Sequence, residues 1–115
     1  MAKPLEYHAS HLHQALAESI EHAVEFPPGM IVTLVHAEIT GDSKYAKGVI
    51  SVLPETLEDE AIRLLKKSAV DIKEQLNKRL RLRQLPNLSW AIDRTEVEAA
   101  KIEKVMNELR EKGEL

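Results

Sequence analysis

Cysteine is absent from this 115-residue chain, and aromatic residues are scarce, with one Trp, two Tyr and one Phe. The lack of cysteine excludes a disulfide framework, a thiolate metal site and a cysteine nucleophile, and it fits a reducing compartment. Long apolar runs are also missing. No stretch approaches the ~20 residues of a membrane helix, and none follows Met1-Ala2-Lys3-Pro4 that could serve as a signal peptide. We therefore expect a soluble, cytoplasmic protein with a single domain over residues 1–115, in which residues 1–8 form a flexible lead.

The sequence also lacks the motifs of the common catalytic sites. It has no phosphate-binding glycine loop, no nucleophile elbow and no His-Glu-x-x-His helix. The acidic run Glu58-Asp59-Glu60 is better explained by the first turn of a helix, where the helix dipole favours negative charge. We expect no enzymatic activity and no cofactor.

Five histidines raise the question of a metal site. His8, His11 and His13 are close in sequence, and His22 falls on roughly the same helical face as His11. A closed zinc site needs four ligands in a tetrahedron, and no carboxylate completes an obvious set. We interpret these side chains as surface histidines and His36 as a packing or edge residue, and we predict no metal.

Charge is unevenly distributed along the chain. The net charge is −3, which argues mildly against nucleic-acid binding. Between residues 63 and 83, however, eight cations face only two acids, Asp71 and Glu74. Such a segment can bind phosphates by releasing counterions, or it can simply be a solvated helix face. The eight cations are Arg63, Lys66, Lys67, Lys73, Lys78, Arg79, Arg81 and Arg83.

Hydrophobic periodicity predicts a helix followed by two strands in the first half of the chain. The helix begins with Ser10 as its cap and ends at Phe26-Pro27-Pro28-Gly29. The strands cover residues 30–40 and 45–52, joined by a polar turn as an antiparallel hairpin. One face of the first strand should carry Ile31, Thr33, Val35, Ala37 and Ile39. One face of the second should carry Ala46, Gly48, Ile50 and Val52.

The second half predicts a long helical stripe, a third strand and a last helix. Thr56 should cap the stripe, which continues to about Arg83. The third strand alternates Leu88, Trp90 and Ile92, so Trp90 belongs to the core. Thr95 and Glu98 form a capping box for the last helix. A three-stranded sheet with helices on one face is a two-layer α+β architecture.

Three segments of this chain carry a further signal. The first reads Ala37-Glu38-Ile39, Gly41-Asp42-Ser43 and Tyr45-Ala46-Lys47 across the two strands. The second, residues 76–86, reads LNKRLRLRQLP. The third covers residues 88–103 and includes Asp93, Thr95, Ala100, Lys101, Ile102 and Glu103. In this order and spacing they resemble ribosome-binding factor A, a family of bacterial assembly factors of the small ribosomal subunit.

The resemblance implies a KH-like fold of the second, bacterial type, in the order α-β-β-α-α-β followed by a C-terminal helix. Classical KH domains clamp nucleotides with a GXXG loop between two helices. This family has an Ala-x-Gly kink there, which corresponds to Ser68, Ala69 and Val70. We therefore expect a bend in the long helix near these residues, although Val70 replaces the glycine. Asn77 also stands where family members often have glycine.

The resemblance also implies a function in late maturation of the immature 30S subunit, with 16S rRNA as the ligand. Members of the family matter most during growth in the cold. By family analogy, an assembly GTPase releases the protein from the 30S subunit. We predict shape and phosphate contacts from a monomer, without a membrane. The alternative is a small α+β protein-interaction module without RNA binding. The predicted RNA-binding residues are Lys66, Lys67, Lys73, Lys78, Arg79, Arg81 and Arg83.

Overall fold

The computed structural model describes residues 9–82, 84–94, 106, 107 and 109, and the element order within them is the predicted one. Residues 1–8 and most of the predicted C-terminal helix lie outside this part, although Met106, Asn107 and Leu109 are helical. The elements are α1 (Ala9–Ala23), β1 (Ile31–Ile39), β2 (Tyr45–Leu53), a 3-10 turn (Glu55–Leu57), α2 (Glu58–Lys67), α3 (Ala69–Leu80) and β3 (Asn87–Ile92).

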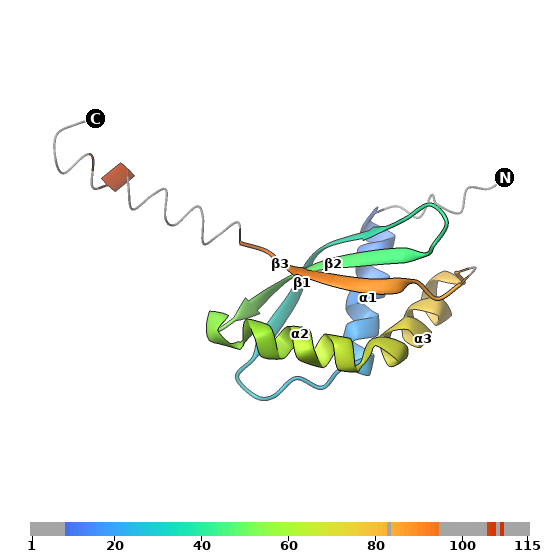
Figure 1. Cartoon of the computed structure of the whole chain (residues 1–115), viewed down its shortest axis with the longest axis horizontal. Coiled ribbons are helices and arrows are strands. Elements are labelled where there is room, and N and C mark those ends of the chain that lie inside the picture. Colours follow the sequence, from blue (N-terminus) through green and yellow to red (C-terminus); the bar gives the residue numbers. More distant parts are fainter. Residues whose placement is uncertain (1–8, 83, 95–105, 108, 110–115) are drawn as a thin grey trace.

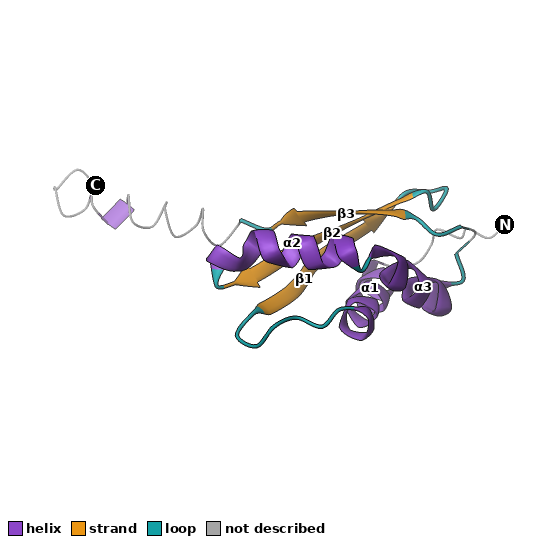
Figure 2. Ribbon diagram, turned by 60° about the horizontal axis from the view of Figure 1, so that its bottom comes forward, coloured by secondary structure: helices purple, strands orange, loops and turns teal. Residues whose placement is uncertain are grey.

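The sheet has the order β1-β2-β3 and is covered by the helices on one face (Figures 1 and 2). β1 and β2 form the predicted antiparallel hairpin. β3 runs parallel to β2, which requires a long crossover, and α2 with α3 provides it. The α+β, two-layer prediction is therefore confirmed.

The core lies between this sheet and the three helices. In β2 the predicted inner residues are all buried, whereas the alternating residues are partly or fully exposed. In α2 and α3 the predicted stripe is buried at Ala61, Leu65, Ile72 and Leu76, each with no exposed surface. Trp90 packs against this core, as the alternation in β3 predicted.

The predicted face of β1 is wrong in its first half. A β-bulge at Val35 breaks the alternation, because Leu34 pairs with Ile50 and His36 with the adjacent Val49. Val32 and Leu34 therefore face the core together with Ala37 and Ile39, while Ile31, Thr33 and Val35 are exposed. One extra residue shifts every side chain that precedes it to the opposite face.

Both predicted helix caps are also wrong. Ser10 lies inside α1, which begins at Ala9. Thr56 lies in the 3-10 turn, and α2 begins after Leu57 without a side-chain cap. The turn after α1 is as predicted: Met30 N–H donates to the Pro27 carbonyl at 3.1 Å, with Gly29 at φ 89°. Gly29 thus occupies the third position of a type II turn, which requires a positive φ. Proline is common at the second position, where this chain has Pro28.

The long helical stripe breaks at Ser68, as predicted. Ser68 has φ −95° and ψ 13°, which ends α2 and begins α3 at Ala69. The backbone ladder is still kept on both sides, because Ser68 N–H donates to the Leu64 carbonyl and Ile72 N–H donates to the Ser68 carbonyl. The break therefore needs no glycine. It allows α2 to pack on β2 while α3 packs on α1.

Gly48 makes room for the indole of Trp90, its neighbour across β2 and β3. A Cβ at position 48 would lie 2.5 Å from Trp90 Cζ3 and 2.8 Å from Trp90 Cε3. It would also lie 3.2 Å from Leu34 Cδ1. The contact with Trp90 is closer than any real Cβ contact allows. Only glycine therefore permits the ring to lie against the backbone of β2.

We predict that Gly48→Ala destabilises the protein by about 1–3 kcal/mol, because the added methyl overpacks the site. Urea denaturation would measure this, followed by the emission of Trp90, the single tryptophan of the chain. The matched control is Gly48→Ala in a Trp90→Leu background, followed by circular dichroism, where the penalty should shrink because the clashing ring is gone. An equal penalty in both backgrounds would contradict this role of Gly48.

Candidate nucleic-acid interface

The predicted cations gather at the C-terminal ends of two helices. Lys66 and Lys67 occupy the last turn of α2, and Lys78 lies in the last turn of α3, followed by Arg81. All four side chains are exposed, and none forms an ion pair with any residue in the part of the chain that the structure describes. Cations at these positions also complement the helix dipoles. They are therefore compatible with helix stability and available to an anionic ligand.

The exposed face of α3 separates these cations into two groups. Asp71 and Glu74 are exposed in its first half, whereas Lys78 follows in its second half. The helix is 12 residues long, which corresponds to about 18 Å. The structure thus gives a pair of lysines at the break and a second pair of cations, Lys78 and Arg81, at the far end, instead of one continuous basic stripe.

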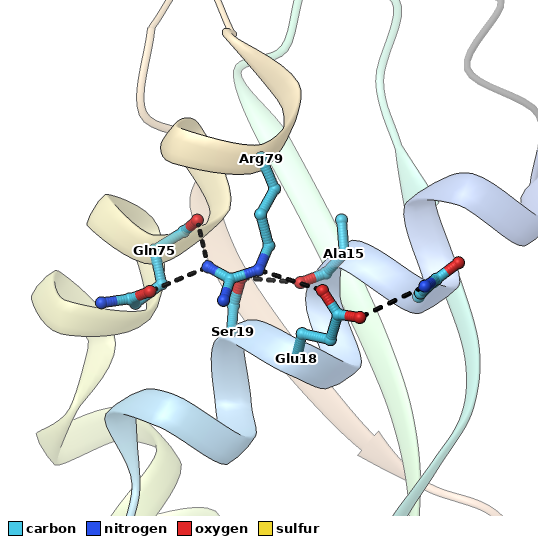
Figure 3. Close-up of polar contacts among 6 residues, drawn as sticks. Ala15, Glu18, Ser19, Gln75 and Arg79 are labelled. Atoms are coloured by element: carbon cyan, nitrogen blue, oxygen red, sulfur yellow. Dashed lines mark hydrogen bonds and ion pairs between the residues drawn. The ribbon is translucent and has the colours of Figure 1, made fainter.

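Arg79 differs from the other cations because its guanidinium is held by the protein (Figure 3). Its Nε donates to Glu18 Oε1 of α1 at 3.3 Å, and one terminal nitrogen donates to the Gln75 carbonyl and Oε1 at 2.9 and 2.8 Å. The side chain is 22% exposed. Hydrogen bonds from Gln14 and then Arg79 lower the pKa of Glu18 below its usual value, so the carboxylate is ionised at neutral pH. Arg79 therefore ties α3 to α1.

The remaining predicted residues lie at the edges of this surface. Lys73 is half-buried on the flank of α3, and Arg83 lies outside the described residues. At the break, Ser68 and Ala69 are half-buried, whereas Val70 points outward and is 63% exposed. Val70 is the second residue of α3, so an exposed apolar side chain follows the lysine pair directly after the break.

The end of α3 is fixed by Asn77. Its Oδ1 accepts from Leu82 N–H at 2.9 Å, and its carbonyl accepts from Arg81 N–H at 2.9 Å. Arg81 itself adopts left-handed backbone, with φ 50° and ψ 56°. A glycine at position 77 could not provide the side-chain bond. Asn77 thus terminates the helix and places Arg81 at its tip.

The loop that follows α3 brings this tip beside the β1–β2 hairpin (Figure 1). Gln84 Nε2 donates to the Asp42 carbonyl at 3.1 Å, and Asn87 N–H donates to the Lys44 carbonyl at 2.8 Å. These contacts add Lys44 to the same end of the molecule. Lys44 could not be identified from the sequence, because the contact spans some 40 residues and depends on the sheet order.

Asp42 organises the hairpin turn rather than a ligand site. Its Oδ1 accepts from Thr40 Oγ1 at 2.7 Å and from Lys44 N–H at 3.0 Å. The bond from Lys44 N–H and then the bond from Thr40 hold the pKa of Asp42 below its usual 3.8. Because the folded pKa is lowered, this carboxylate stabilises the turn at neutral pH. The stabilisation is lost as the pH falls through the lowered pKa.

The described residues offer little to a metal. In residues 9–82 and 84–94, no three His, Asp or Glu side chains gather to hold an ion. The histidines of α1 are exposed or half-buried, and His36 lies exposed in β1 with its Nε2 3.5 Å from Glu38 Oε1. No helix in this part of the chain is long and apolar enough to cross a membrane.

The fold and this surface define a class: a KH-like α+β protein whose two central helices meet at a break and carry cations at their ends. The sequence profile of the family described as ribosome-binding factor A matches residues 5–106. The chain therefore belongs to the ribosome-binding factor A family.

Individual relatives agree with this. The chain is 34% identical over 83 residues to ribosome-binding factor A of Bdellovibrio bacteriovorus, covering 71% of this chain and 61% of that protein. It is 32% identical over 98 residues to that of Staphylococcus carnosus, covering 84% and 85%. The crystal structure of ribosome-binding factor A from Thermus thermophilus superposes with a TM-score of 0.62 at 25% identity, covering 73% of this chain and 90% of that one.

We predict that Arg79→Met lowers the free energy of unfolding by about 1 kcal/mol or more, because it removes the charge-assisted bond to Glu18 that joins α3 to α1, together with the bonds to Gln75 within α3. Urea denaturation measures the loss. Lys78→Met is the matched control, since Lys78 is exposed without a partner among the described residues, and its effect should stay within about 0.5 kcal/mol. Equal stabilities of the two variants would contradict the packing role of Arg79.

Proposed function

We propose that this protein is a ribosome biogenesis factor that binds the immature 30S subunit, contacts its 16S rRNA and assists late maturation and rRNA processing. The observation that carries the proposal is the family membership together with the exposed cations at the ends of α2 and α3, which form no ion pair with any described residue. A homology model of the Thermus thermophilus protein has been fitted into a cryo-EM map of a 30S complex. That structure is similar to this chain, with a TM-score of 0.62, and covers 76% of it.

Binding would depend on phosphate contacts. Lys66 and Lys67 at the break, with Lys78 and Arg81 at the tip of α3, would each neutralise a phosphate and release a counterion. We leave Arg79 out of the primary contact set, because its guanidinium is engaged with Glu18 and Gln75. Lys73 would act from the flank. Phosphate contacts position a protein without reading sequence, so the shape of the RNA would select the site.

The other parts of the proposal follow from this role. We propose that residues 1–115 act as a single KH-like domain, as a monomer in the cytoplasm, and that the protein works by binding without catalysing a reaction. Release from the 30S subunit would require another factor, for which an assembly GTPase is the candidate by family analogy. Cold adaptation would be the physiological setting.

A protein-interaction module is the second candidate function. The net charge of −3 and the acids Asp71 and Glu74 on the exposed face of α3 favour it. The two functions differ in their response to salt. Binding through about four phosphates gives a slope near −3 to −4 in a plot of log affinity against log salt concentration. A mainly apolar protein interface would show little dependence.

We predict that the double variant Lys78→Gln and Arg81→Asn weakens binding to a 16S rRNA transcript and reduces the magnitude of the salt slope by about 2, one for each lost phosphate contact. Filter binding over a range of salt concentrations measures both quantities. Asparagine is chosen at position 81 because it tolerates left-handed backbone.

The matched control is the double variant Arg63→Gln and Arg94→Gln, which has the same net charge. These two cations already form ion pairs, Arg63 with Glu60 at 2.7 Å and Arg94 with Glu58 at 3.0 Å. The control should keep the salt slope of the unaltered protein. If both double variants bind the transcript equally, the contacts assigned to Lys78 and Arg81 are wrong, and a slope near zero for the unaltered protein would favour the protein-interaction module.

A further inference from the structure

Tyr45 is a large aromatic side chain left open to solvent on the helix-free face of the sheet. It is 58% exposed, whereas the next residue, Ala46, is only 3% exposed on the opposite face. The other aromatic side chains within the described residues, Phe26 and Trp90, pack against the core. Tyr45 is thus the aromatic ring of this part of the chain that is available to a ligand.

The surface around Tyr45 is open and mixes polar with apolar side chains. A groove of about 210 Å³ runs beside it, lined by Glu38, Thr40, Lys47 and Ser89 among others. This volume is below the ~300–1,000 Å³ of ordinary small-molecule sites, so the groove suits one planar ring rather than a folded ligand.

Two cations flank the ring. Lys44 precedes Tyr45 in the hairpin turn, and Lys47 lies two residues further along β2 on the same face. Both are exposed, and neither forms an ion pair with a residue that the structure describes. Asp42 is the nearby acid of the turn, and its carboxylate accepts hydrogen bonds from Thr40 Oγ1 and Lys44 N–H. The combination of an aromatic face with flanking lysines is typical of single-strand binding surfaces.

The ring also lies at the end of the molecule where α3 finishes. Gln84 bonds to the Asp42 carbonyl and Asn87 N–H to the Lys44 carbonyl, and Asn87 is the partner of Tyr45 in the parallel register. The loop after Arg81 therefore runs directly to the strand beside Tyr45 (Figure 1). A nucleic-acid strand held at the tip of α3 can continue onto the open face of the sheet.

We propose that Tyr45 is a stacking platform for one unpaired base of RNA, at a site on the open sheet face that continues the cationic surface at the end of α3. This inference rests on the proposed function, because the cations supply the phosphate affinity and Tyr45 adds a contact to a base. It gives the protein a preference for single-stranded over fully paired RNA, without reading sequence, since every base has an aromatic face.

The test compares two 12-nucleotide RNAs of equal charge, one carrying bases throughout and one with abasic sites at its central positions, at a single salt concentration. The unaltered full chain should prefer the base-bearing RNA by roughly fivefold to 150-fold, the range measured for one stacked base. Tyr45→Val should lose that preference, because valine suits an exposed strand position but has no aromatic face. Tyr45→Phe should keep it, since stacking does not need the hydroxyl.

The outcomes separate this site from the function on which it rests. If the unaltered protein binds RNA but Tyr45→Val retains the preference for bases, the stacking site is overturned and the proposed function stands. If the unaltered protein binds neither RNA, the stacking site and the proposed RNA-binding function are both wrong. The salt slope provides a second readout: Tyr45→Val should leave it unchanged because no phosphate contact is lost, whereas Lys78→Gln with Arg81→Asn reduces it.

Discussion

The break at Ser68 is the constraint on which the rest of this structure depends. One apolar stripe runs from Ala61 to Leu80, and it is fully buried on both sides of the break, at Ala61, Leu65, Ile72 and Leu76. A single straight helix could not bury all of it, because α2 packs on the sheet at β2 whereas α3 packs on α1. The break divides the stripe, so that α2 covers β2 and α3 packs along α1. It also creates two helix C-termini where a single helix would have one, and both of them carry cations.

This division explains the arrangement of charge. Cations at the ends of α2 and α3 interact favourably with the helix dipoles and remain exposed, so the same residues can stabilise the fold and stay accessible to an anionic ligand. Arg79 is the exception, since the docking of α3 on α1 turns its side chain toward Glu18. The tip of α3 is fixed by Asn77 and then tied to the hairpin through Gln84. A chain with a negative net charge can thus present a locally cationic end.

Much of the fold could be predicted from the sequence, because periodicity reports burial directly. The stripe of α2 and α3, the inner face of β2 and the core position of Trp90 were all predicted. The bulge at Val35 could not be, because it depends on pairing with β2, and it inverted the predicted face of β1. For the site, the basic residues were visible in the sequence. The bond of Arg79 to Glu18 and the bonds that join the loop after α3 to the hairpin at Asp42 and Lys44 were not, because they connect distant segments.

We propose that this chain binds the small ribosomal subunit through phosphate contacts. Cosedimentation of the purified protein with isolated small subunits and with intact ribosomes, at low and raised salt, tests it most directly. We expect binding to free small subunits that weakens as salt is raised, with little binding to intact ribosomes. Absence of binding to either particle, or binding that salt does not affect, would contradict it and would direct attention to protein partners.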